Sequence, residues 1–189
     1  DAALATGGLT TSVVSRSGTN MSRGFAQFDF LNGSAFKNEM FQPRDGLFNS
    51  GQDISGGYGG PIIRDRLWFF AAGGLHATGR TNFAADGETP GDLSAGTYLG
   101  KFSWSGGVNR FTALATGSGF ERLGYGAGPD RNAETTWNQS GPTNIYKLED
   151  THIFSSNFYL TGLYSHVNGG FQLDPLGTAT PVQTNDLPY

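Results

Sequence analysis

Two kinds of connection, short turns and long polar segments, follow one another in strict alternation along this chain. They join stretches in which apolar and polar residues alternate with a period of two, as in a strand with two different faces. The expected strands are 23–32, 54–63, 67–75, 97–105, 110–118, 144–150 and 157–167. The short turns are 64–66, 106–109 and 151–156, and the long segments are 31–52, 79–96, 119–143 and 168–189. The sequence therefore predicts an antiparallel, all-β sheet of hairpins.

Short turns on one side and long loops on the other are typical of a bacterial outer-membrane β-barrel. Several of the expected strands approach the 9–11 residues that a tilted strand needs to cross a bilayer. The 30 glycines disfavour helices, and the 13% aromatic content suits strands. No run of about 18 apolar residues is present, so no transmembrane helix is expected. The expected fold is an antiparallel transmembrane β-barrel fragment with about seven crossing strands.

Composition excludes several other classes of protein. A net charge of −4 disfavours a nucleic-acid partner, which selects a basic surface. The absence of cysteine excludes a disulfide framework and thiolate metal sites. Neither a signal peptide at the first residues nor a strand at the polar C-terminal end is expected, so we interpret the chain as a piece of a longer protein.

The alternation assigns side chains to two faces. The apolar set, expected to face lipid, includes Phe28, Phe30, Phe102, Trp104, Tyr146, Leu148, Phe158, Leu160 and Tyr164. The polar set, expected to face a lumen or a plug, is Gln27, Asp29, Lys101 and Glu149. Lysine on a lipid face at mid-depth would cost about 2–4 kcal/mol, which Lys101 avoids on the polar face.

Glycine is concentrated in the strand 54–63, at positions 56, 57, 59 and 60. Glycine in a strand often marks close approach of another backbone, and a plug inside a barrel is the expected neighbour. Pro61 lacks an amide donor and is expected near a strand end. Trp68, directly after a short turn, is expected in an aromatic girdle at the lipid–water interface.

Two motifs resemble a known family. Residues 10–20, TTSVVSRSGTN, followed by Arg23 and Gly24, are similar to the junction between plug and barrel in TonB-dependent outer-membrane receptors. Residues 59–70, GGPIIRDRLWFF, are similar to the first periplasmic hairpin of that family. The similarity is closest to the Oar-like receptors, whose N-terminal domain is carboxypeptidase-regulatory-like. The strand layout extends the resemblance over nearly the whole chain.

The resemblance implies that residues 1–20 are the C-terminal end of a plug domain, with a last plug strand at 8–17. Residues 21–189 would be the N-terminal, incomplete part of a barrel of about 22 strands. The implied function is energy-coupled uptake of a large or scarce solute across the outer membrane, with neither catalysis nor a cofactor. The implied partners are outer-membrane lipid, the protein's own plug, an imported ligand and the inner-membrane TonB complex. The family's TonB-contacting segment lies near its N-terminus and is not among these residues.

Side chains that could carry chemistry are few. The histidines at positions 76, 152 and 166 have no metal-ligand spacing, so no metal site is expected. Glu149 and Asp150 are neighbours in a strand and point to opposite faces, which does not suit a general acid–base pair. Trp137, Phe41 and Phe48 lie in long polar segments, where their rings either stack on a ligand such as a sugar or pack the loops together.

Two other functions fit the residues. One is a passive porin or adhesin barrel without a plug, for which a signal peptide would directly precede the first residue. The other is a soluble, secreted all-β binding module such as a lectin-like sandwich. The sandwich predicts that Phe28, Phe102, Trp104 and Tyr146 meet in a dry centre between two stacked sheets.

Overall fold

The computed structural model describes residues 15–33 and 46–177, which form one open, antiparallel sheet of nine strands. The strands are β1 (Arg23–Asn32), β2 (Leu47–Ile63), β3 (Leu67–Ala84), β4 (Gly87–Pro90), β5 (Leu93–Gly106), β6 (Asn109–Tyr125), β7 (Trp137–Ser155), β8 (Phe158–Gly169) and β9 (Gln172–Pro175). Seven long strands are ordered β1-β2-β3-β5-β6-β7-β8, while short β4 pairs with β3 and short β9 with β7. The predicted all-β, antiparallel class and the order of its hairpins are confirmed.

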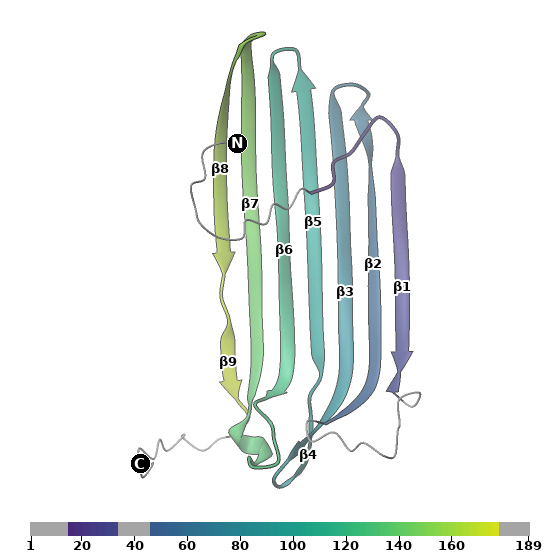
Figure 1. Ribbon diagram of the computed structural model, residues 1–189, viewed down its shortest axis with the longest axis vertical. Coiled ribbons are helices and arrows are strands. Elements are labelled where there is room, and N and C mark those ends of the chain that lie inside the picture. Colours follow the sequence, from purple (N-terminus) through teal and green to yellow (C-terminus); the bar gives the residue numbers. More distant parts are fainter. Residues whose placement is uncertain (1–14, 34–45, 178–189) are drawn as a thin grey trace, which may run out of the picture.

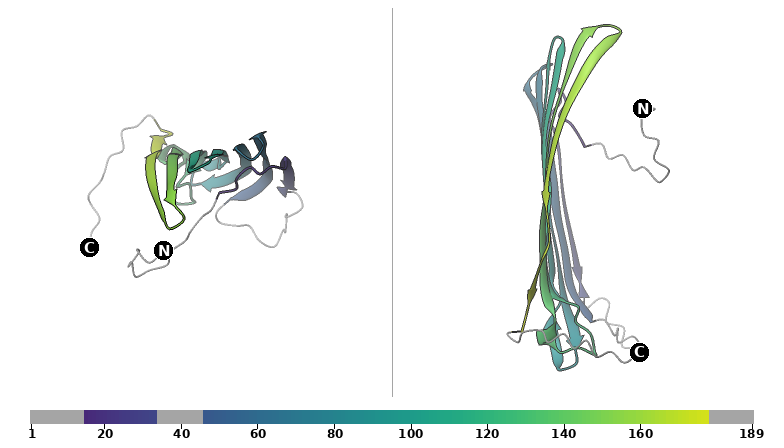
Figure 2. Two further views of the ribbon diagram at one scale, coloured as in Figure 1. Left: turned by 90° about the horizontal axis from the view of Figure 1, so that it is seen from above. Right: turned by 90° about the vertical axis from the view of Figure 1, so that its left-hand side faces the viewer.

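The connections sort to the two ends of the sheet (Figure 1). At the upper end in Figure 1, β2 turns into β3, β5 into β6 and β7 into β8 through short turns. Asp65 and Gly107, in two of these turns, both have a φ of 62°, a left-handed conformation that Asp and Gly tolerate. The longer connections lie at the lower end. The side view shows a thin, gently curved single layer (Figure 2).

The strands extend further than the sequence predicts, mostly toward the end with long loops, although β7 also continues to Ser155 through most of the turn expected at 151–156. The strand expected at 54–63 begins at Leu47, and the one expected at 67–75 continues to Ala84. β7 runs over Trp137–Ser155 instead of 144–150. The apolar face stops near Leu75, but backbone pairing continues through Gly, Ser, Thr and Asn residues because each strand has a neighbour to pair with. Only β1 has the predicted bounds on both sides.

The strand expected at 8–17 is not present in its described part, residues 15–17. Residues 15–17 have no strand conformation, and residues 8–14 lie outside the described part of the chain. Residues 15–22, which we call the strap, instead run across one face of the sheet before β1, in front of β5 and β3 in Figure 1.

The sheet has no core of its own, because no hydrophobic side chain among the described residues is buried. Phe28 is 64% exposed and Phe102 51% exposed. At the loop end the connections contact one another, where the Ala85 amide donates to the Arg131 carbonyl (2.8 Å) and the Ala133 amide to Asp86 Oδ1 (2.8 Å). Among the described residues no helix is long and apolar enough to span a membrane.

Candidate functional site

The pairing register divides the side chains of the seven long strands between two faces. Directly paired residues share a face, so Leu75 of β3 lies beside Ile54 of β2, which lies beside Phe28 of β1. This apolar face carries Phe28, Ile54, Tyr58, Phe69, Leu75, Tyr98, Phe102, Trp104, Tyr146, Leu148 and Tyr164. Phe28, Phe102, Trp104 and Tyr146 therefore lie on one exposed face and not between two stacked sheets.

Between the levels of Trp68 and His76, charge lies on the opposite, polar face, whereas Asp150, one residue nearer the short turns, shares the apolar face with Phe111. Between the levels of Trp68 and His76 in β3, the apolar face carries no Asp, Glu, Lys or Arg. Between the same levels the polar face carries Arg23, Asp29, Asp53, Lys101, Lys147 and Glu149. The charged residues expected on the polar side are therefore brought to one surface, together with Gln27.

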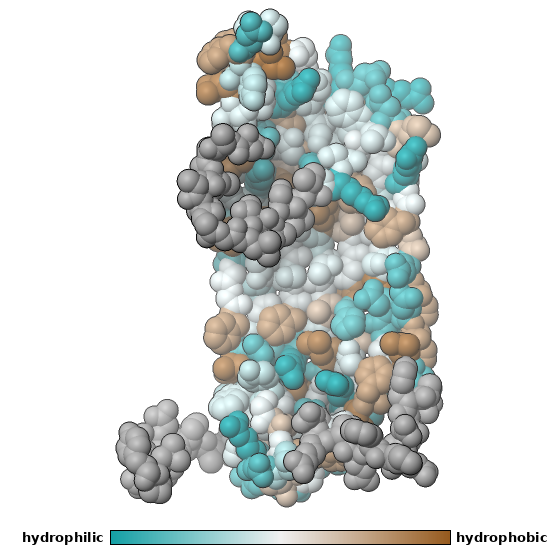
Figure 3. Space-filling view, in the orientation of Figure 1, coloured by the Kyte–Doolittle hydropathy of each residue, from teal (hydrophilic) through white to brown (hydrophobic). Residues whose placement is uncertain are grey.

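Figure 3 shows the polar face in the orientation of Figure 1, in which the strap lies between the sheet and the viewer. A pale band of intermediate hydropathy crosses its middle, and above and below it hydrophilic side chains are interspersed with brown, hydrophobic ones. The lysines nearest the short turns both have partners. Lys147 Nζ lies 2.9 Å from Glu149 Oε2, and Lys101 Nζ lies 3.2 Å from Ser15 Oγ of the strap.

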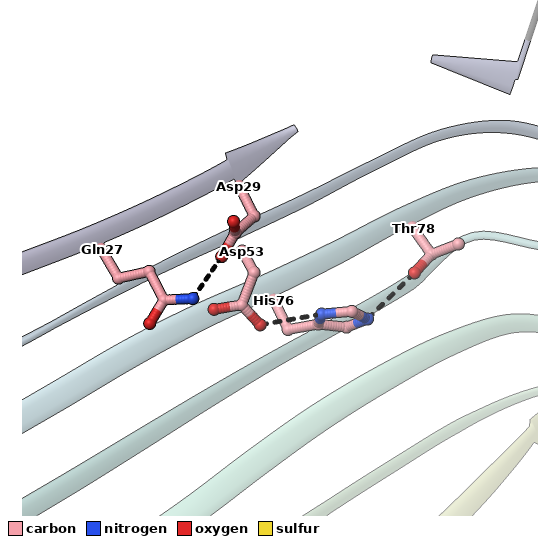
Figure 4. Close-up of polar contacts among 5 residues, drawn as sticks. All are labelled: Gln27, Asp29, Asp53, His76 and Thr78. Atoms are coloured by element: carbon pink, nitrogen blue, oxygen red, sulfur yellow. Dashed lines mark hydrogen bonds and ion pairs between the residues drawn. The ribbon is translucent and has the colours of Figure 1, made fainter. Parts of the chain in front are cut away.

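Two groups of polar contacts, Gln27 with Asp29 and Asp53 with His76 and Thr78, lie side by side near the level of His76 (Figure 4). Asp29, Asp53 and His76 are direct cross-strand neighbours on β1, β2 and β3. His76 Nδ1 lies 3.3 Å from Asp53 Oδ2, and its Nε2 lies 3.0 Å from Thr78 Oγ1. Gln27 Nε2 donates to Asp29 Oδ2 (2.6 Å). Two carboxylates, those of Asp29 and Asp53, are cross-strand neighbours here, so this polar cluster of Gln27, Asp29, Asp53, His76 and Thr78 is suited to hydrogen-bond donors and cations.

The sequence interpretation did not bring Asp53 and His76 together, because both lie one residue outside the expected strands 54–63 and 67–75. The register shifts by one residue between Pro61 and Ile63, so counting outward from the turn 64–66 pairs Asp53 with the wrong residue. The alternation of polar and apolar residues could have identified the pair, because the side chains of Asp53 and His76 point to the face opposite to their apolar neighbours Ile54 and Leu75. Pro61 itself lies near the end of β2, as expected.

Trp68 is on the polar face, so its expected place in a lipid-facing girdle is wrong. It pairs with Pro61 and Ser103, and its indole Nε1 donates to Asn20 Oδ1 of the strap (2.7 Å). Trp104 and Phe111 are among the aromatic residues at this end of the apolar face.

Trp137 and Phe48 lie in strands rather than in the loops where the sequence places them. Trp137 begins β7 opposite Tyr125, which Arg122 covers at 5.0 Å from the ring centre. Phe48 lies in β2, with its ring against Gly51. Both rings are half-buried at the loop end, but they are four strands, or roughly 19 Å, apart along the sheet. Phe41 lies outside the described residues.

The three histidines lie far apart. His76 belongs to the polar cluster, His152 is hydrogen-bonded to Asn109, and His166 stacks on Tyr146 with 6.4 Å between ring centres. Within residues 15–33 and 46–177 no three metal-ligating side chains gather. Glu149 and Asp150 point to opposite faces, since they pair with Thr112 and Phe111 respectively.

The strap shows what the polar face can bind. It crosses the backbone of β3 at Phe69 and contacts Lys101 of β5, and the guanidinium of Arg16 lies 5.5 Å from the centre of the Phe25 ring. One extended segment therefore lies on this face, with Ser15 hydrogen-bonded to Lys101. No known protein family, curated protein or solved structure matches the chain.

Proposed function

We propose that this chain is part of the barrel wall of a TonB-dependent outer-membrane receptor, which takes up a large or scarce solute by energy-coupled transport. In this proposal the apolar face meets outer-membrane lipid. The polar face lines a lumen that holds the receptor's own plug domain. The short turns lie in the periplasm, and the long loops face the outside of the cell.

The separation of charge between the two faces is the observation that carries the proposal. An exposed apolar face of this size is unstable in water, because each large side chain left exposed forgoes about 1.5–3 kcal/mol of burial. Lipid covers such a face, provided that no charge lies on it, and between the levels of Trp68 and His76 none does. The apolar part of β3 spans about nine residues, the length that a tilted strand needs to cross a bilayer.

The strap favours a filled lumen over the open channel of a passive porin. Its backbone lies against β3, and it occupies Lys101, a cation of the polar face. A chain that enters the barrel wall from inside is what a plug followed by a barrel requires. The resemblance of residues 10–24 to a plug–barrel junction supports the same reading.

The proposal is tested by fractionation and uptake with the full-length protein in a Gram-negative host. We expect the protein in the outer membrane, resistant to alkaline and high-salt washes and released by detergent. Uptake is then measured with labelled ferric chelates, cobalamin and oligosaccharides, in cells with and without TonB. We expect one probe whose uptake requires both the protein and TonB.

The alternatives give different results in the same experiment. A porin or adhesin would reside in the outer membrane, but any uptake would not depend on TonB, and the gene would encode no plug upstream. A soluble binding module would be extracted by buffer without detergent, which would contradict every barrel reading.

A further inference from the structure

One side chain of the strap, Asn20, makes two hydrogen bonds to the turn between β2 and β3 and a third to Trp68 at the start of β3. Its Nδ2 donates to Asp65 Oδ1 (2.5 Å). Its Oδ1 accepts from the Asp65 amide (3.0 Å) and from the indole Nε1 of Trp68 (2.7 Å). Asn20 therefore joins a segment before the first strand to a turn 45 residues later.

These bonds support a turn that is conformationally demanding. The Arg66 amide closes the turn on the Ile63 carbonyl (3.1 Å), and Asp65 has a φ of 62°. A non-glycine residue is uncommon in that conformation, and Asp tolerates it when its polar groups find local partners. Asn20 supplies a partner for both the amide and the carboxylate of Asp65.

The strap residues before Asn20 and those after it contact the sheet in different ways. On the C-terminal side, Ser22 lies so close to Gly60 that a Cβ on this glycine would come 2.5 Å from Ser22 Oγ. On the N-terminal side, a side chain at Gly18 would overlap the carbonyl oxygen of Phe69, so the strap lies flat on β3. At Ser15 the attachment is one flexible lysine, Lys101, whose Nζ lies 3.2 Å from Ser15 Oγ and 3.5 Å from Ser15 O.

We infer that Asn20 is the positioning residue that fixes the strap to the sheet. It holds residues 15–19 over the polar face, supports the turn 64–66, and marks the point up to which the strap can lift away while the sheet stays intact. In the proposed receptor, a pull on the chain ahead of Ser15 would release Lys101 first and be resisted at Asn20. This last step rests on the proposed function, whereas the fixation itself does not.

A charge-exchange pair tests the fixation in the purified full-length protein. Asn20→Asp removes the Nδ2 donor and brings two carboxylates together, whereas adding Asp65→Asn restores one donor and one acceptor. Asn157→Asp, in the exposed turn between β7 and β8, is the matched control at the same end of the sheet. Hydrogen exchange of the peptide covering 64–66 reports on the Asp65 amide, whose hydrogen bond Asn20 accepts.

We expect Asn20→Asp to speed this exchange about three- to tenfold, the double variant to return it to within about twofold of wild type, and the control to leave it unchanged. Cross-linking then follows the strap itself. Residues 1–189 contain no cysteine, so Ser15→Cys with Lys101→Cys, in a full-length protein with any other cysteine replaced by serine, can be joined by a short bis-maleimide. Adding Asn20→Asp should lower the cross-linking yield severalfold, and adding Asp65→Asn should restore it.

Unchanged exchange in Asn20→Asp would overturn the inference. So would faster exchange with an unchanged cross-linking yield, because Asn20 would then support the turn without holding the strap. Neither readout uses lipid or uptake, so a failed transport proposal and a failed fixation remain distinguishable.

Discussion

At the scale of single residues, charge distinguishes the two faces more sharply than hydropathy does. The polar face also carries Phe25, Leu99 and Ile145, so apolar side chains alone would not separate it from its opposite. Charged residues are more discriminating, because a charge in hydrocarbon costs several times more than an apolar group in a lumen.

A lysine should therefore be tolerated on one face of β5 only. Gly100 lies on the apolar face, and a Cβ added there would meet nothing within 4 Å, so Gly100→Lys introduces charge without a clash. We expect it to lower the free energy of unfolding in bilayers by about 2–4 kcal/mol. Ser103→Lys, on the polar face of the same strand, should change this free energy by less than about 1 kcal/mol. Denaturant unfolding in lipid vesicles measures both, and equal losses would argue against lipid on the apolar face.

At the scale of elements, the glycine-rich stretch of β2 makes room for neighbours within the sheet and for the strap. A Cβ at Gly57 would come 2.7 Å from the Phe25 ring and 3.1 Å from Ala72 Cβ. A Cβ at Gly59 would come 2.7 Å from the Phe70 ring. Of the four glycines, Gly60 is the one that accommodates the strap, through Ser22.

Gly57→Val should consequently be costly although valine favours strands. We expect a loss of about 1–3 kcal/mol in the free energy of unfolding, because the Phe25 ring must leave its place. Gly162→Val is the control, since a Cβ there meets nothing within 4 Å and valine improves strand propensity. Denaturant unfolding of both variants in detergent checks this, and a Gly57→Val protein as stable as the control would contradict the packing described for β2.

Much of the arrangement of the strands, and of which side chains share a face, could be predicted from the sequence. Alternation in 23–32 and 97–105 assigned Asp29 and Lys101 to the same side as the structure does. The far halves of β2, β3, β6 and β7 could not be predicted, because beyond the apolar face both sides are polar and the period of two carries no signal. Long-range contacts such as Asn20 with Asp65 were also beyond reach, since they depend on where the strap crosses the sheet.

At the scale of the whole molecule, the open sheet has two unpaired edges. Among the described residues, β1 pairs only with β2, and β8 only with β7. Alternate residues of such an edge point their amides and carbonyls away from the sheet, which hydrocarbon does not tolerate. Closure by further strands of the full-length protein would satisfy them.

Hydrogen exchange in the full-length protein reports on this closure. We expect every amide within Arg23–Asn32 to be protected in lipid, including those that point away from β2. Rapid exchange at alternate residues of β1 would mean that this edge stays open, and the barrel would then not close at this strand.

The central claim is that the apolar face meets lipid while the polar face meets an aqueous or plug-filled interior. It is tested most directly by single spin labels at each position from 97 to 105 of β5 in the full-length protein in bilayers, with collision rates measured against oxygen and a water-soluble nickel complex. We predict a period of two, with oxygen accessibility highest at Tyr98, Gly100, Phe102 and Trp104 and lowest at the residues between them. High nickel accessibility at both sets, or low accessibility to both reagents at the apolar set, would contradict it.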